Sequence, residues 1–275
     1  MRTIALLGAL AFVAGCAETP PPPAAPTPLA PPSAEAKAQL APTGALRVAV
    51  LTSNPVIGTK DAASGQLKGT TADLGSDLAR KTGVPVKLIE YTAIPRLMDD
   101  AAKDAWDVAV VAIDPARRSI VDFSPAHLAA DGFLTILVPP GSTVRTMADF
   151  DRPGMRVAAV KNAAPLMILE RTLKHAKVAP ADNENAAFAM MKDGQADGYA
   201  QNRFMLRARA QTLPGSRLLD DAFAGLRLSF ALPKGRPAAV QYVAAFVEHA
   251  KAAGEVQRAI DANGLQGEVK VAPAE

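Results

Sequence analysis

Short apolar runs alternate with amphipathic segments over most of this chain, and this alternation limits the possible fold more than any other feature. The apolar runs are rich in β-branched residues, which favours strands, while spacing of apolar residues by three and four positions favours helices. The first block has expected strands at residues 46–51, 84–91, 108–113 and 133–138, and expected helices at residues 72–82 and 96–103. A chain that alternates strand and helix in this way forms an α/β layer structure whose sheet is mostly parallel.

The same pattern then restarts in a second block. Its expected strands are residues 156–160, 198–201 and 226–232, and its expected helices are residues 164–176, 185–192, 203–211, 238–252 and 255–262. Two blocks, each long enough for a modest core, predict two α/β lobes with parallel-rich sheets.

The only cysteine of the chain follows an apolar stretch at the N-terminus. Residues 4–14 are apolar but too few to cross a bilayer as a stable anchor, which is typical of an export signal. The segment Val13-Ala14-Gly15-Cys16 resembles the lipobox of bacterial lipoproteins. The resemblance implies that residues 1–15 are a signal peptide and that Cys16 carries acyl chains, including palmitate, that anchor the protein to a membrane. The alternative is an ordinary secretory signal followed by a chance cysteine.

Ala17 follows the cysteine, and by the usual sorting pattern this residue favours the outer membrane if the cell has one. Residues 16–43 are rich in proline, including the run from Pro20 to Pro23, and such a segment is a stiff, extended chain that cannot bury a core. We therefore interpret residues 16–43 as a tether on the periplasmic side of a membrane.

Composition excludes several other classes of protein. The chain has 30 basic and 27 acidic residues, a near balance that argues against a nucleic-acid footprint. The single cysteine leaves no partner for a disulfide within the chain, so burial of apolar surface has to stabilise it. No second apolar run is long enough for a transmembrane helix.

A series of short motifs resembles one known family. The motifs are residues 44–50 (GALRVAV), 65–69 (GQLKG), 106–108 (WDV), 114–117 (DPAR), 121–124 (VDFS), 194–197 (GQAD) and 233–235 (PKG). They occur in the order found in the extracellular solute-binding proteins of family 3, the polar amino-acid binding type. The resemblance extends from about Gly44 to Gly264, which is nearly the whole chain after the tether.

The resemblance implies the two-lobe periplasmic binding fold of type II, in which two crossovers join the lobes and the ligand lies between them. Lobe one is expected at residues 44–130 and 224–265, lobe two at residues 131–223, and a C-terminal tail at residues 266–275. Closure of such lobes around a ligand is a hinge motion.

Arg117 is the residue that the resemblance marks most clearly as a ligand contact. The arginine at this place in the family pairs with the carboxylate of the ligand, and a planar guanidinium can form two parallel charge-assisted bonds to a carboxylate. Arg118 is the alternative, but the spacing to the motif at residues 121–124 favours Arg117, with Arg118 as a surface residue. Asp122 is expected to have a structural role near the crossover.

Other expected pocket positions depart from the family pattern. Asp114 replaces a usual threonine, the loop before a lobe-two helix reads Asn162-Ala163, and Ser53 lies where an aromatic side chain is usual. The acid that usually holds the ligand's ammonium group falls at Asn202, and an amide cannot neutralise a buried cation. The sequence leaves two alternatives open: a carboxylate ligand without a facing ammonium group, or a substitute acid such as Asp114.

His127, His175 and His249 lie far apart in the sequence and have no metal-ligand spacing, so each is expected to be a surface or capping residue. No phosphate-binding loop or nucleophile motif is present, and we expect neither a metal nor a cofactor.

The sequence therefore predicts a membrane-tethered binding protein without enzymatic activity, which delivers a small carboxylated solute, an amino acid or related organic acid, to an ABC-type permease. One alternative is a sensory or accessory lipoprotein whose cleft has decayed. Another is a dehydratase-like enzyme acting on a cyclic carboxylic acid, which needs an acid or base near Arg117; Asp114 and Glu170 are the candidates.

Overall fold

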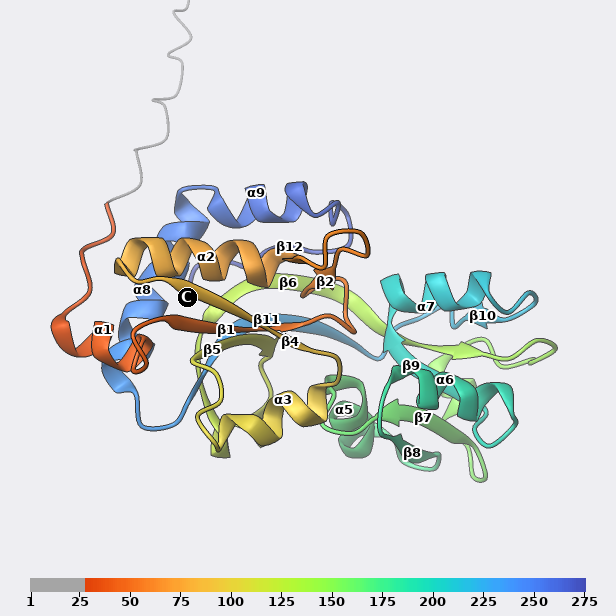
Figure 1. Cartoon of the computed structure of the whole chain (residues 1–275). Helices are drawn as coiled ribbons and strands as arrows, with labels where there is room; N and C mark the ends of the chain where they lie inside the picture. The colour runs from red at the N-terminus through yellow and green to blue at the C-terminus, as the bar shows by residue number, and fades with distance from the viewer. Residues whose placement is uncertain (1–27) are drawn as a thin grey trace, which may run out of the picture.

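The computed structural model describes residues 28–275, and Figure 1 shows two lobes joined by long strands. The proposed signal peptide, Cys16, Ala17 and the rest of the proline-rich segment up to residue 27 lie outside the described residues. Within residues 28–275, no helix is both long and apolar enough to cross a membrane.

Lobe one is built on a parallel arrangement of three strands. β1 (Leu46–Leu51) lies between β4 (Val86–Tyr91) and β5 (Val108–Ala112) and pairs with both in parallel. Helices pack around these strands and are α1 (Ala34–Leu40), α2 (Thr70–Thr82), α3 (Ile94–Ala101), α8 (Pro237–Ala252) and α9 (Glu255–Ala262). A small hairpin of β2 (Thr59–Lys60) and β3 (Leu67–Lys68) precedes α2.

Lobe two repeats the design with fewer covering helices. β7 (Arg156–Val160) pairs in parallel with β8 (Lys177–Ala181) on one side and with β9 (Gly198–Asn202) on the other. The other elements of this lobe are α4 (Met147–Phe150), α5 (Ala164–Thr172), α6 (Glu184–Lys192), α7 (Arg203–Gln211) and the short β10 (Arg217–Leu218). The expected two-lobe α/β architecture with parallel-rich sheets is confirmed.

Two long antiparallel strands connect the lobes. β6 (Val121–Val138) and β11 (Ala224–Pro233) pair with each other and run from one lobe to the other, as Figure 1 shows. The strands form one sheet in the order β4-β1-β5-β11-β6-β9-β7-β8, and β12 (Lys270–Val271) also pairs with β6. The sequence predicted only the last third of β6, residues 133–138, because Pro125 and Asp131 interrupt the apolar pattern while pairing with β11 keeps the backbone extended.

A second boundary differs from the expectation. The helix expected at residues 164–176 ends at Thr172, and the chain then forms β8, which the sequence did not predict. β8 is the last strand of the sheet and contains Pro180, a residue that strands accept at a sheet edge because it cannot donate a ladder hydrogen bond.

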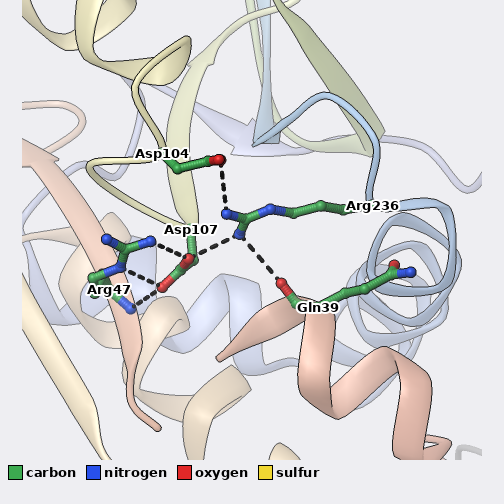
Figure 2. Close-up of polar contacts among 5 residues, drawn as sticks. All are labelled: Gln39, Arg47, Asp104, Asp107 and Arg236. Carbon is green, nitrogen blue, oxygen red and sulfur yellow. Dashed lines mark hydrogen bonds and ion pairs between the residues drawn. The ribbon is translucent and has the colours of Figure 1, made fainter. Parts of the chain in front are cut away.

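A cluster of charges centred on the buried Asp107 joins distant parts of lobe one (Figure 2). Asp107, at 0% exposure, accepts from the Arg47 side chain at 2.8 and 3.0 Å and from Arg236 Nη1 at 2.8 Å. Arg236 also donates to Asp104 at 3.0 Å and to the backbone oxygen of Gln39 at 3.2 Å. The cluster therefore joins α1, β1, the start of β5 and the start of α8, which are far apart in the sequence.

His127 corrects one expectation from the sequence. It lies in β6 at 0% exposure, stacked on Phe230 with ring centroids 5.0 Å apart, and is neither a surface nor a capping residue. Burial is the main cause that lowers the pKa of His127 to about 3, and the charge of Lys251 adds to it, so the ring is neutral at physiological pH.

Candidate functional site

A small cavity lies between the lobes, against the strands that join them. Its volume is about 50 Å³. Lobe one contributes Leu51, Asn54, Ile57, Ile94, Val111, Ala112 and Arg117, lobe two contributes Ala163, Ala164, Pro165, Glu184 and Gln201, and β11 contributes Leu226 and Leu228. The wall is mostly aliphatic, with one basic and one acidic side chain.

Arg117 is positioned by the 3₁₀ helix η1 (Pro115–Ser119), which follows β5 and turns the side chain inward. Its residue exposure is 4%, and its guanidinium donates to the Ala112 oxygen at 2.7 Å and to the Asn162 oxygen at 2.5 Å. The Nε atom has no hydrogen-bond partner among the described residues. Burial lowers the pKa of Arg117 to about 10, opposed by nearby Asp114, so the side chain is still a cation at neutral pH. Arg118 beside it is exposed, as expected.

Asp114 has partners of its own. Its carboxylate accepts from the Ala116 backbone N–H at 2.9 Å and caps η1, and it receives two bonds from Arg171 of α5, at 2.7 and 3.2 Å. Burial opposes ionisation of Asp114, but the bonds from Arg171 and Ala116 outweigh it and lower the pKa of the carboxyl. Asp114 does not line the cavity, so this geometry gives no support to its role as a substitute acid for a ligand.

The Asn162-Ala163 loop crosses toward lobe one. Asn162 has a positive φ of 59°, a conformation that asparagine tolerates better than most residues, and its carbonyl accepts from Arg117. Ala163 is the N-cap residue of α5 and lines the cavity, but it supplies no side-chain cap. The loop thus faces the guanidinium through a backbone oxygen rather than through hydroxyl groups.

Asn202 and Ser53 lie beside the cavity rather than in its wall. Asn202 is 1% exposed; its side-chain oxygen caps α7 by accepting from the Met205 N–H at 2.8 Å. Its amide nitrogen donates weakly to Asn54 of lobe one at 3.4 Å. Ser53 lines a neighbouring hollow of about 400 Å³, together with Glu184 and Arg209.

Glu184 is the acidic residue of the cavity wall, and the sequence analysis missed it. It is the first residue of α6, partly buried, and accepts from the Tyr199 hydroxyl and from Gln201 Nε2, the latter at 2.8 Å. Burial raises the pKa of Glu184, although both hydrogen bonds oppose the rise. The sequence offered one indication of this contact. Tyr199 and Gln201 are two positions apart in β9, so both side chains lie on one face of the sheet, where both donate to Glu184.

The described residues give little support to metal binding or to acid–base catalysis at the cavity. Residues 28–275 contain no group of three or more His, Cys, Asp or Glu side chains arranged to hold a metal ion. Glu170, one of the two acid–base candidates, is exposed on α5 and does not line the cavity, and Asp114 is paired with Arg171. Neither therefore faces the guanidinium of Arg117 across the cavity.

Comparison with known proteins agrees with this architecture. GlnH, an ABC transporter glutamine-binding protein of Bacillus subtilis, is 26% identical over 211 residues, covering 74% of this chain and 76% of that protein. The virulence sensor protein BvgS of Bordetella pertussis is 28% identical over 176 residues, which cover 61% of this chain and 13% of that protein. An ancestral arginine-binding protein bound to glutamine has a similar fold, with a TM-score of 0.68 and 24% identity over 81% of this chain and 99% of that one.

The family assignment follows from a longer match. Residues 46–264, from the first strand of lobe one to just beyond the end of α9, match the family described as bacterial extracellular solute-binding proteins, family 3. The match covers well over half of the chain and both lobes. The chain therefore belongs to the bacterial extracellular solute-binding proteins of family 3.

Proposed function

We propose that the protein captures a small carboxylated solute between its lobes and delivers it to an ABC permease. The observation that carries the proposal is Arg117, a cation buried at the wall of the interlobe cavity whose Nε has no partner among the described residues. A buried guanidinium with only neutral acceptors is incompletely compensated. A carboxylate offers it two parallel charge-assisted bonds, which two separate carbonyl groups cannot match.

Binding requires the lobes to separate first. The cavity of about 50 Å³ has room for a few water molecules, whereas pockets for small-molecule ligands are typically about 300 Å³ or larger. The bond from Arg117 to the Asn162 carbonyl joins the two lobes, so it has to break when they open. The antiparallel strands β6 and β11 connect the lobes and are the natural hinge. A ligand carboxylate then takes the place of the Asn162 oxygen.

The membrane attachment belongs to the same proposal. Lipidation of Cys16 followed by a stiff proline-rich segment would hold the lobes at a distance from a membrane, the outer membrane if Ala17 directs sorting in the usual way. Replacing Cys16 with Ser should move the protein from the membrane fraction to the soluble periplasmic fraction. Unchanged membrane association of Cys16→Ser would contradict lipidation.

A pair of neighbouring arginines tests the ligand site. Arg117→Lys keeps the charge but loses the planar fork, and Arg118→Lys makes the same change at an exposed position one residue away. We expect a calorimetric screen of amino acids, keto acids and aromatic acids to identify a carboxylate that binds the native chain. Arg117→Lys should weaken its binding about ten-fold or more, as expected for loss of a bidentate contact. Equal affinity of the two variants would contradict the proposed site.

A sensory role is the second candidate. The similarity to part of the BvgS sensor favours it. The bond from Arg117 to the Asn162 oxygen of the opposite lobe also favours it, because this bond narrows the cavity in which a carrier would hold its solute. A sensor and a carrier both bind through the cleft but differ in the partner that reads the closed form. Loss of solute uptake in a deletion strain, restored by the native chain and not by Arg117→Lys, would favour the carrier.

A further inference from the structure

Glu184 is a carboxylate inside the cavity region with no basic partner. Among residues 28–275 it forms no ion pair, and its two bonds come from the neutral Tyr199 hydroxyl and the neutral Gln201 amide. Tyr199 is 0% and Gln201 6% exposed, so water has little access to this side of the carboxylate. Hydrogen bonds from neutral groups hold the position of the side chain but leave its negative charge uncompensated.

The basic side chain that acts on the charge of Glu184 has other contacts. Arg209 lies close enough to influence Glu184 electrostatically, yet its guanidinium donates to Asn185 at 2.6 Å and lies over the Phe188 ring, 5.1 Å from the centroid. Arg209 therefore reduces the cost of the buried charge without forming a contact pair. The face of Glu184 that lines the cavity is open to a cation from outside the chain.

Arg117 stands in the wall of the same cavity with the opposite charge. The remaining wall is dominated by aliphatic side chains such as Ile57, Val111 and Leu228, and it contains no aromatic ring. A ligand with a carboxylate alone would satisfy Arg117 but would bring a second negative charge toward Glu184. A ligand with both charges satisfies both side chains, and its uncharged part fits an aliphatic wall.

We infer that Glu184 binds the protonated amine of a small aliphatic amino acid whose carboxylate is held by Arg117. The inference rests on the proposed function and adds the class of ligand to it. Tyr199 and Gln201 act as positioning residues, because each donates to one oxygen of the Glu184 carboxylate and fixes its orientation. Asn202 does not perform this role, since its side-chain oxygen is already used to cap α7.

Matched pairs of ligands test the inference on the unmodified protein. L-Valine is compared with 3-methylbutanoate, and L-2-aminobutyrate and 4-aminobutyrate are each compared with butyrate, by calorimetry. Each pair differs only by the amine, and the two aminobutyrates differ in its distance from the carboxylate. We expect at least one amino acid to bind about ten-fold or more tightly than its deaminated partner. Removing the amine leaves the Glu184 carboxylate without its cation, and a loss of about 1.4 kcal/mol in binding free energy corresponds to ten-fold in affinity.

A Glu-to-Gln substitution then assigns that preference to one side chain. Glu184→Gln should weaken binding of the preferred amino acid about ten-fold and change binding of the deaminated acid less than about three-fold. Glu170→Gln is the matched control, because Glu170 is exposed on the same lobe and lies outside the cavity wall. The thermal midpoints of both variants report whether they are folded.

The outcomes separate this inference from the proposed function. If carboxylates bind through Arg117 but an amine gives no advantage in the native protein, or Glu184→Gln retains the advantage, the role of Glu184 is overturned while the proposed site stands. If no carboxylate binds, or binding ignores Arg117→Lys, the proposed function itself fails and this inference fails with it.

Discussion

Asp114 of lobe one and Arg171 of lobe two form an ion pair with two bonds, of 2.7 and 3.2 Å, across the gap between the lobes. The Asp114 side chain is 4% exposed and that of Arg171 is 49% exposed. Asp114 also caps η1, the short helix that carries Arg117. The segment from Asp114 to the end of η1 therefore places the Arg117 guanidinium at the cavity and also binds lobe two through Arg171.

The first prediction concerns this ion pair as a lobe contact. Arg171→Gln removes the cation and leaves Asp114 its backbone partner, so we expect the closed form to lose about 1 kcal/mol, a five-fold shift toward open lobes. Small-angle scattering or an interlobe spin-label distance measures the shift. Arg152→Gln is the control, because Arg152 is exposed on lobe two and its side chain donates to the backbone oxygen of nearby Asp149 in the same lobe. An unchanged interlobe distance in Arg171→Gln would show that the pair does not stabilise closure.

The same contact should respond to acid. The folded-state pKa of Asp114 lies below its ordinary value of 3.8, so the stabilisation from its ionised form is complete above about pH 4. It is lost as the pH falls through the lower folded-state pKa. The interlobe distance of the native chain should therefore be constant near neutrality and increase only in strong acid, whereas that of Arg171→Gln should depend less on pH.

The second prediction concerns the stability of lobe one. Asp107→Asn removes the charge that lies between Arg47 and Arg236 and leaves two largely buried cations without their anion. We expect a loss of about 3 kcal/mol in the free energy of unfolding. Asp104→Asn is the control within the same cluster: the Asp104 side chain is 69% exposed, and its loss should cost less than about 1 kcal/mol. Denaturant unfolding of both variants measures the difference; equal losses would contradict it.

The third prediction concerns His127. Its folded-state pKa of about 3 lies below the ordinary value of 6.5, so between these values the unfolded chain binds a proton that the folded chain does not. The free energy of unfolding is therefore unaffected by this histidine above about pH 6.5. Below that pH it falls by up to about 1.4 kcal/mol per pH unit.

His127→Leu tests this origin of acid sensitivity. Neither ring nitrogen has a hydrogen-bond partner among the described residues, so an apolar replacement of similar size should leave stability at pH 7 unchanged or slightly increased. Stability should then depend less steeply on pH between 6 and 4. His175→Gln changes an exposed histidine and should keep the native pH profile. A variant His127→Leu with the native profile would locate the acid sensitivity elsewhere.

The order of strands and helices was predictable because it depends on local patterns. The spacing of apolar residues predicted α9 at its observed bounds and β1 within lobe one, and the motif order predicted the family. β8 was missed because an edge strand buries little and its sequence carries a weak pattern. The roles of Arg117, Asn162, Ala163, Asn202 and Ser53 toward a ligand stay predictions.

The sequence by itself determined two α/β lobes, the family, and the choice of Arg117 over Arg118 as the inward guanidinium, since each depends on residues close together in the chain. Only the tertiary structure decided that Asp114 pairs with Arg171, 57 positions away, and that Glu184 faces the cavity with Tyr199 and Gln201 behind it. It also decided that His127 is buried, because α8 packs against β6 and the His127 ring stacks on Phe230. Charges and polar groups acquire their roles from neighbours brought together by folding, and the energy of each depends on burial that no local pattern specifies.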